Sequence, residues 1–215
     1  PAQLLVGLVR PVVVARYCEE RDFSAAAETC QGFALINIAI IGALFSGLVV
    51  GGTEILTWVS GGKYGVDALV LLAALLFVLA LETHRLILEM LAQTVERYGF
   101  LVPSNLFLSL SIVPAAMIFP LVGAVAFPVV NGLALAISNF WVRSLLIRAG
   151  HDFPSQWRPT LKVCLLMTVS ILLGKAFVAV GMYWLMAMAL SQIFFFLGTW
   201  KLCGAELRIF LADLM

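Results

Sequence analysis

Six long apolar stretches fill the chain from about residue 33 onward, and short polar or glycine-rich connections separate them. They run over Phe33–Val59, Val66–Leu91, Phe100–Pro120, Gly123–Leu146, Leu161–Phe177 and Gly181–Trp200. A helix needs about 20 apolar residues to cross a bilayer. Strands of a membrane barrel are shorter and alternate apolar with polar residues, whereas these stretches are apolar throughout. The pattern therefore predicts an all-α polytopic bundle of about six transmembrane helices.

The basic residues favour one side of such a bundle. If the stretches cross the membrane in turn, ten of the 13 Lys and Arg residues fall on the same side. These are Arg10, Arg16, Arg21, Arg97, Arg143, Arg148, Arg158, Lys162, Lys201 and Arg208. Lys63 and Lys175 fall on the other side, and Arg85 lies within a stretch. Because Lys and Arg are enriched in cytoplasmic connections, we expect the segment before Phe33 and the C-terminus to be cytoplasmic.

Composition supports a membrane protein. Hydrophobic residues make up 63% of the 215 residues, charged residues make up 12%, and the mean hydropathy is +1.08. A soluble domain of this size needs more polar surface to meet water. The basic residues are dispersed over the connections and are explained by topology, so we do not expect nucleic acid as a partner.

The same pattern divides the chain into three parts. Residues 1–32 are interpreted as the end of a preceding span and a cytoplasmic loop, because Pro1–Ala15 starts in the middle of an apolar phrase. Residues 33–200 are the expected six-helix transmembrane lobe, and residues 201–215 are the expected cytoplasmic tail. We therefore expect the chain to be the C-terminal part of a longer, transporter-sized protein.

The second stretch carries the charges that are most unusual for a membrane span. Glu82, Arg85 and Glu89 are spaced so that they share one face of a helix, where Arg85 can pair with both carboxylates. Intramembrane charges often line a water-filled cavity, here one that would open to the cytoplasm. The alternative is that these long side chains reach the lipid headgroups from the inner part of the span. His84 is either a proton-linked switch or a packed, hydrogen-bonded residue.

Uncharged polar residues form a second group of candidates. Asn131, Ala134 and Ser138 share a face of the fourth stretch, and Asn105 and Ser109 share a face of the third. Small and polar faces are usual where helices pack together in lipid. The alternative is that they donate hydrogen bonds to a sugar or phosphate in a cavity, and Asn131 is the candidate for that role.

Several kinds of chemistry lack their signatures. The sequence has no P-loop, no Gly-x-Ser-x-Gly elbow and no His-Glu-x-x-His motif. The four cysteines, Cys18, Cys30, Cys164 and Cys203, match no zinc spacing. The pair His151–Asp152 in the longest connection is interpreted as a solvated loop rather than an acid–base pair. We expect no catalytic activity, no cofactor and no metal site.

Short motifs along the chain occur together in one exporter superfamily. A proline-led helix end at Arg10–Arg16 precedes an arginine-and-acidic loop at Glu20–Asp22 and the three alanines Ala25–Ala27. A glycine–tyrosine turn at Gly61–Tyr64 closes the next span, and Gly123–Ala126 opens a later one. In these features the chain resembles the multidrug/oligosaccharidyl-lipid/polysaccharide exporter superfamily, and within it the polysaccharide or O-antigen flippases. It departs from them at Val122, where the family often has a further glycine-containing turn.

The resemblance implies a protein of two pseudo-symmetric lobes, of which this chain is most of the second. It implies alternating access, in a bacterial inner (plasma) membrane, around a cationic cavity for a lipid-linked sugar diphosphate. Arg85 would then attract the diphosphate, because a guanidinium matches phosphate oxygens. Glu82 and Glu89 would hold Arg85 or take part in ion coupling. The expected partners are membrane lipid, the lipid-linked oligosaccharide and other polysaccharide export proteins.

Other functions remain open from the sequence. A drug/cation antiporter of the same superfamily would need an essential carboxylate deep in a span. A membrane-embedded glycosyltransferase or polymerase subunit would normally carry a larger loop outside the membrane. A membrane subunit of a polysaccharide synthesis and export complex is a further alternative. A purely structural subunit would have its charged strip against headgroups or a partner helix, and replacing these residues would have no effect.

Overall fold

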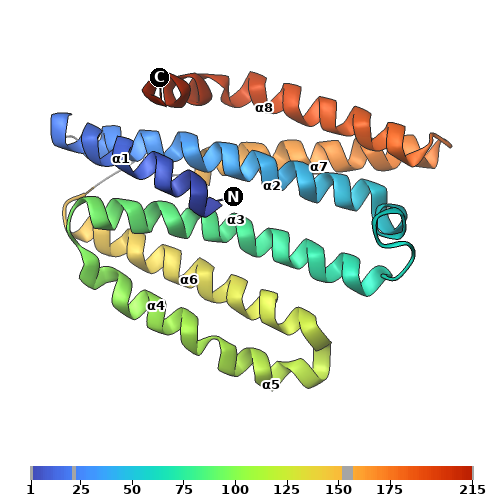
Figure 1. The fold of residues 1–215 in the computed structure, drawn as a ribbon, viewed down its shortest axis with the longest axis horizontal. Helices are drawn as coiled ribbons and strands as arrows, with labels where there is room; N and C mark the ends of the chain where they lie inside the picture. The colour runs from blue at the N-terminus through green and yellow to red at the C-terminus, as the bar shows by residue number, and fades with distance from the viewer. Residues whose placement is uncertain (1, 21–22, 152–156, 215) are drawn as a thin grey trace.

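The structure, a computed structural model, describes residues 2–20, 23–151 and 157–214. Within these ranges the chain is helical, without a strand (Figure 1). The α-helices are α1 (Ala2–Glu20), α2 (Phe23–Ser60), α3 (Val66–Thr94), α4 (Leu101–Leu110), α5 (Ile112–Val122), α6 (Ala126–Arg148), α7 (Trp157–Ala179) and α8 (Trp184–Leu214). Single 3₁₀ turns, η1 (Tyr98–Phe100) and η2 (Gly123–Val125), precede α4 and α6.

Five helical stretches of the described chain are long and apolar enough to cross a membrane. The longest, Tyr98–Arg148, has 51 residues and contains α4, α5 and α6. It reverses direction at Gly123, where φ is 67°, so that α6 returns alongside α4 and α5 (Figure 1). Each of the six predicted stretches is therefore mainly helical, and Phe100–Pro120 covers both α4 and most of α5. The prediction of an all-α polytopic bundle is confirmed.

Helices extend beyond the limits that the apolar pattern suggests. Helix α1 packs against α2 and buries Val9 and Val13 in the core, α2 already begins at Phe23, and α8 continues past Trp200 to Leu214. The predicted boundaries at residues 32 and 200 therefore fall inside helices. The reason is that an apolar run ends at the first polar residues, whereas a helix can continue out of the membrane. The loop residues Arg21 and Asp22 and the loop residue Asp152 lie outside the described ranges.

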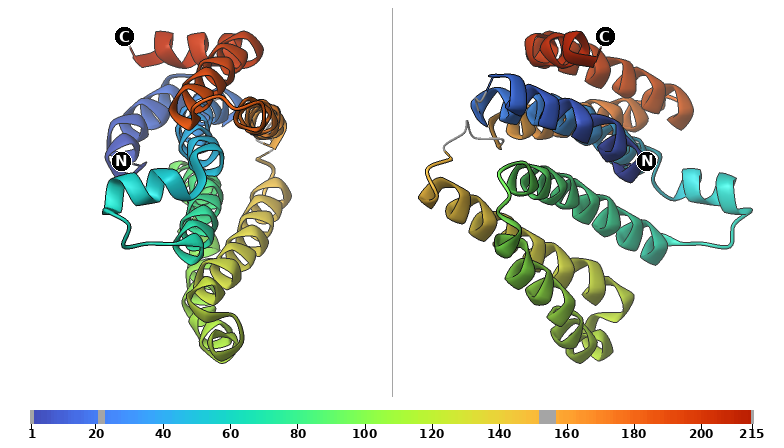
Figure 2. Two further views of the ribbon diagram at one scale, coloured as in Figure 1. Left: turned by 90° about the vertical axis from the view of Figure 1, so that its right-hand side faces the viewer. Right: turned by 60° about the vertical axis from the view of Figure 1, so that its left-hand side comes forward.

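The helices form two groups that meet mainly through α2 and α3 (Figure 2). Helices α2, α7 and α8 make one group, in which glycines allow close approach. A Cβ atom at Gly174 of α7 would lie 2.6 Å from Cγ2 of Val50, and one at Gly198 of α8 would lie 2.7 Å from Cδ2 of Leu166. Helices α3 and α6 make the second group, with α4 and α5 packed on α6. The small residues therefore set the tightest helix contacts, as is usual in lipid.

Helix α2 is broken near its C-terminal end. Gly52 has φ 57° and ψ −139°, a conformation that residues with a side chain rarely adopt. The segment after it is a short helix set off from the axis of α2 (Figure 2), and it exposes Trp58 and Val59. Lys175 Nζ of α7 lies 3.5 Å from the carbonyl of Val50, two residues before the break. The predicted span Phe33–Val59 is thus two helical segments.

A second break separates α4 from α5 at Ser111. Pro114 has no N–H, and its ring would clash with the carbonyl four residues earlier, at Leu110, which is the last residue of α4. Pro103 and Pro128 do not interrupt their helices. Each is the third residue of its helix, where a missing N–H removes no helical hydrogen bond.

Candidate functional site

The charged strip of α3 forms as its spacing predicts. Arg85 Nε donates to both carboxylate oxygens of Glu82, at 3.0 and 3.1 Å. Its Nη2 lies 3.7 Å from Oε2 of Glu89, one turn further on. The side chains of Arg85, Glu82 and Glu89 are 24%, 32% and 27% exposed, so none of the three is buried in the protein core. We call these three residues the α3 strip.

A residue of α4 completes the surroundings of Arg85. The Nη1 group of Arg85 donates a 2.7 Å hydrogen bond to Oδ1 of Asn105. Helix α4 packs chiefly on α6 and has little contact with α3, so this bond links two helices that otherwise hardly touch. The sequence placed Asn105 on a polar face but did not pair it with Arg85. No local pattern joins residues that lie 20 positions apart on different helices.

Two openings lie between α3, α4–α5 and α6, and the first of them reaches the strip at Glu82. The first, about 450 Å³, has leucine and valine walls and two polar residues, Glu82 and Asn131. The second, about 380 Å³, shares Asn131 and adds the hydroxyls of Ser109 and Ser111. Of the predicted site residues, Glu82 and Asn131 therefore line an opening, and Arg85 and Glu89 are joined to it only through their contacts in the α3 strip. These openings can bind a polar or charged group inside an otherwise apolar bundle.

His84 lies on the other side of α3. Its side chain is buried, and Nε2 lies 3.1 Å from Oγ1 of Thr160 at the start of α7. The two residues line an opening of about 190 Å³ between α2, α3 and α7 that is otherwise almost entirely apolar. His84 is therefore part of the contact between the two helix groups, away from the α3 strip.

Buried polar side chains join α6 to its neighbours. Asn139 Nδ2 donates a 3.0 Å hydrogen bond to the backbone carbonyl of Leu81. Ser104 and Ser138 share a hydrogen bond between α4 and α6, and all three side chains are buried. Ser138 belongs to the polar face identified in the sequence, and its role here is helix packing. Asn139 was missed, and its only signal in the sequence was an amide in the middle of an apolar stretch.

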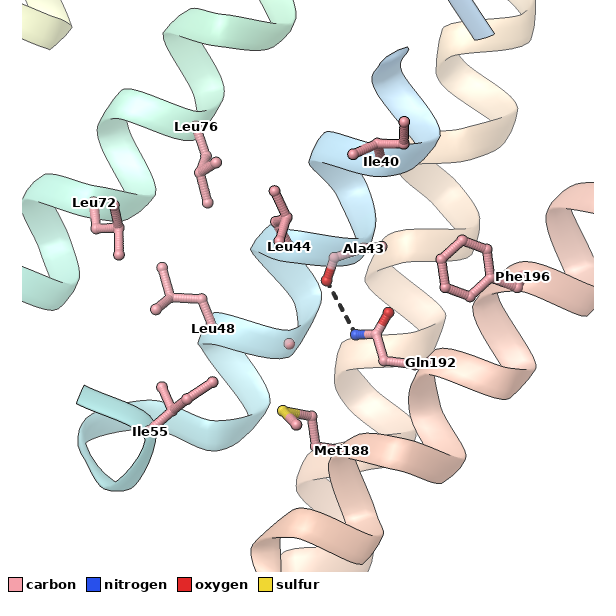
Figure 3. A pocket seen from close by; sticks show the side chains of 11 residues that line it. Ile40, Ala43, Leu44, Leu48, Ile55, Leu72, Leu76, Met188, Gln192 and Phe196 are labelled. Atoms are coloured by element: carbon pink, nitrogen blue, oxygen red, sulfur yellow. Dashed lines mark hydrogen bonds between the residues drawn. The ribbon is translucent and has the colours of Figure 1, made fainter. Parts of the chain in front are cut away.

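A further opening, of about 560 Å³, lies along α2 between α3 and α8 (Figure 3). Its walls are apolar, with Leu44, Leu72 and Phe196 among them, and its polar residue is Gln192. Gln192 Nε2 donates to the Ala43 carbonyl at 3.1 Å and to Ser46 Oγ at 2.9 Å. The amide group therefore joins α8 to α2. The opening is suited to apolar chains and not to a charged group.

Comparisons with protein-family models, curated proteins and solved structures find no match to this chain. The resemblance to polysaccharide flippases therefore stays a prediction from the sequence motifs. The chemistry of the site consists of the guanidinium of Arg85, the carboxylates of Glu82 and Glu89, and the amide of Asn105. Glu82 and the amide of Asn131 line an opening in the membrane bundle.

Proposed function

We propose that this chain is a lobe of a membrane transporter that flips a lipid-linked oligosaccharide across the bacterial inner membrane by alternating access. The observation that carries the proposal is the partly exposed guanidinium of Arg85, which is bonded to Glu82 at the edge of an opening in an apolar bundle. A guanidinium matches the geometry and charge of phosphate oxygens. The sequence resemblance supplies the substrate class.

The surroundings of Arg85 suit a carrier for a substrate with a charged head group and an apolar tail. The amide of Asn105 bonds Arg85, and the side chains of Ser109 and Asn131 line the opening of about 380 Å³. These amide and hydroxyl groups can bond sugar hydroxyls. The helices beside these groups have long apolar faces, so the lipid tail can stay in the bilayer. In this proposal no bond is made or broken, and the protein supplies a polar path for the head group.

The test is complementation of a strain that lacks its own lipid-linked oligosaccharide flippase. The Arg85→Ala variant is expected to abolish complementation, because no other cation of the α3 strip can replace the guanidinium. Arg97→Ala is the matched control, since Arg97 is exposed in the connection between α3 and α4. Both variants must reach the membrane at the level of the wild type. Full complementation by Arg85→Ala would remove Arg85 from the mechanism.

A further inference from the structure

Residues 53–60, the part of α2 that follows the break at Gly52, leave the direction of the bundle. The long helices run across the view in Figure 1, whereas this segment is seen end on, and in Figure 2 it projects from the end of α2. A helix of this length measures only about 12 Å, which is too short to cross a bilayer. The segment, which we call the 53–60 helix, therefore lies across the end of the bundle and is steeply inclined to the spans.

The 53–60 helix has two distinct faces. Successive residues of a helix are turned by about 100°, so its side chains divide into an apolar arc and a polar arc that do not overlap. The apolar arc contains Ile55, Leu56, Trp58 and Val59, and the polar arc contains Thr53, Glu54, Thr57 and Ser60. The hydroxyls of Thr57 and Ser60 donate to backbone carbonyls one turn back, at 2.8 and 2.6 Å. This division is typical of a helix that lies in a membrane interface.

Protein covers only part of the apolar arc. Ile55 lines the 560 Å³ opening between α2, α3 and α8, and it packs on Gly51, where a Cβ atom would lie 3.2 Å from Ile55 Cβ. Trp58 and Val59 follow on either side of Ile55 on this arc, and they are 74% and 71% exposed. The described part of the chain therefore leaves most of both side chains uncovered. Large apolar side chains grouped on a surface indicate a partner that is itself at least partly apolar.

The place of the 53–60 helix in the chain identifies this partner. The helix lies between two spans, because it ends α2, and α3 begins after a short glycine-rich connection. In that connection Gly61 and Gly62 have φ values of 64° and 83°, and Tyr64 is exposed. The helix is therefore at the level where the spans leave the bilayer. Trp and Tyr are enriched at this level, because one end of each ring system is apolar and the other is polar.

We infer that the 53–60 helix is an interfacial anchor, whose partner is the boundary between the headgroups and the acyl chains of the bilayer. Trp58 and Val59 enter this boundary on one side of the helix, and Thr57 faces water on the other. Gly52 allows the arrangement, because its positive φ turns the chain out of the direction of the span. The anchor fixes the level of α2 in the membrane. The inference does not depend on the proposed function.

The experiment measures the depth of Trp58 in the bilayer. The full chain is placed in phosphatidylcholine vesicles whose acyl chains are brominated either near the headgroup or near the methyl end, and its tryptophan fluorescence is recorded. The chain has five tryptophans, so the signal of Trp58 is the difference between the wild type and Trp58→Phe. Trp58 is expected to lose at least about twofold more intensity to the shallow bromines than to the deep ones, because an interfacial helix enters the boundary by only about 5–10 Å.

Thr57→Trp, made in the Trp58→Phe chain, is the matched control. It moves the same reporter by one residue, about 100° around the helix, to the polar arc. This tryptophan is expected to be quenched by aqueous iodide at least about twofold more than Trp58, and hardly by either brominated lipid. Both positions are exposed, so neither substitution removes a contact from the core.

Three results overturn the inference. Equal quenching of the two tryptophan positions by iodide, with no quenching by brominated lipid, places the 53–60 helix in water. Stronger quenching of Trp58 by the deep bromines places it in the hydrocarbon, as a continuation of the span. Protection of Trp58 from iodide and from both brominated lipids means that a protein surface, such as that of a second copy of the chain, covers the apolar arc. None of these results bears on Arg85, so the proposed function is tested separately.

Discussion

At the scale of single residues, helical periodicity predicted the part of the site that belongs to one helix. The pairing of Arg85 with Glu82 and Glu89 follows from their spacing alone. The contact to Asn105 depends on how α4 packs on α6 beside α3, which the sequence does not encode locally. His84 follows Glu82 and precedes Arg85 in sequence but faces α7, because successive residues of a helix point about 100° apart.

The bond between His84 and Thr160 is expected to stabilise the contact between the two helix groups. Thr160→Val keeps the shape of the side chain and removes this buried 3.1 Å bond, so the free energy of unfolding should fall by about 1 kcal/mol. Thr168→Val is the control, because Thr168 is exposed and bonds only the carbonyl of Cys164 in its own helix. Unfolding of purified protein in detergent measures both. Equal stability of Thr160→Val and Thr168→Val would contradict a stabilising role for the bond.

At the scale of elements, the breaks in the helices were only partly predictable. Prolines mark a possible break in any sequence, and Pro114 coincides with the interruption between α4 and α5. Gly52 could not be distinguished from the glycines that serve helix packing, such as Gly174. The difference between them is tertiary. Gly52 has a positive φ, whereas Gly174 is helical and lies against Val50 of another helix.

The contact of Gly174 with Val50 gives a test of helix packing. Gly174→Ala would place a methyl group 2.6 Å from Cγ2 of Val50, and we expect it to lower the free energy of unfolding by roughly 1–3 kcal/mol. The double variant with Val50→Ala should recover part of this loss, because the clashing methyl groups are gone. Gly204→Ala in α8 is the control, since nothing lies within 4 Å of its Cβ position. Loss of stability in Gly204→Ala equal to that in Gly174→Ala would show that a general helix effect, not the contact, is responsible.

At the scale of the whole molecule, the order and direction of the helices followed from the apolar pattern, because each connection is short. The way in which the helices pack into two groups did not follow from that pattern. Nothing in the sequence shows that α2, α7 and α8 pack as one group while α4 and α5 lie on α6. The openings beside Glu82 and Asn131 result from this arrangement, since α4 leaves α3 largely uncovered. The positions of charged residues were thus predictable, and the space around them was not.

The orientation in the membrane is the last property that the helices alone do not determine. Lys63 and Arg97 lie in exposed connections at opposite ends of α3, a helix of 29 residues and so about 40 Å long. The concentration of basic residues predicts that Arg97 is cytoplasmic and Lys63 external. In a cysteine-free background, Lys63→Cys should therefore react with a membrane-impermeant maleimide in intact cells. Arg97→Cys should react only after the membrane is permeabilised, and this second step shows that its thiol is accessible. The reverse pattern would invert the topology and place the Lys63 end of α3, the end nearer the opening lined by Leu72 and Glu82, in the cytoplasm.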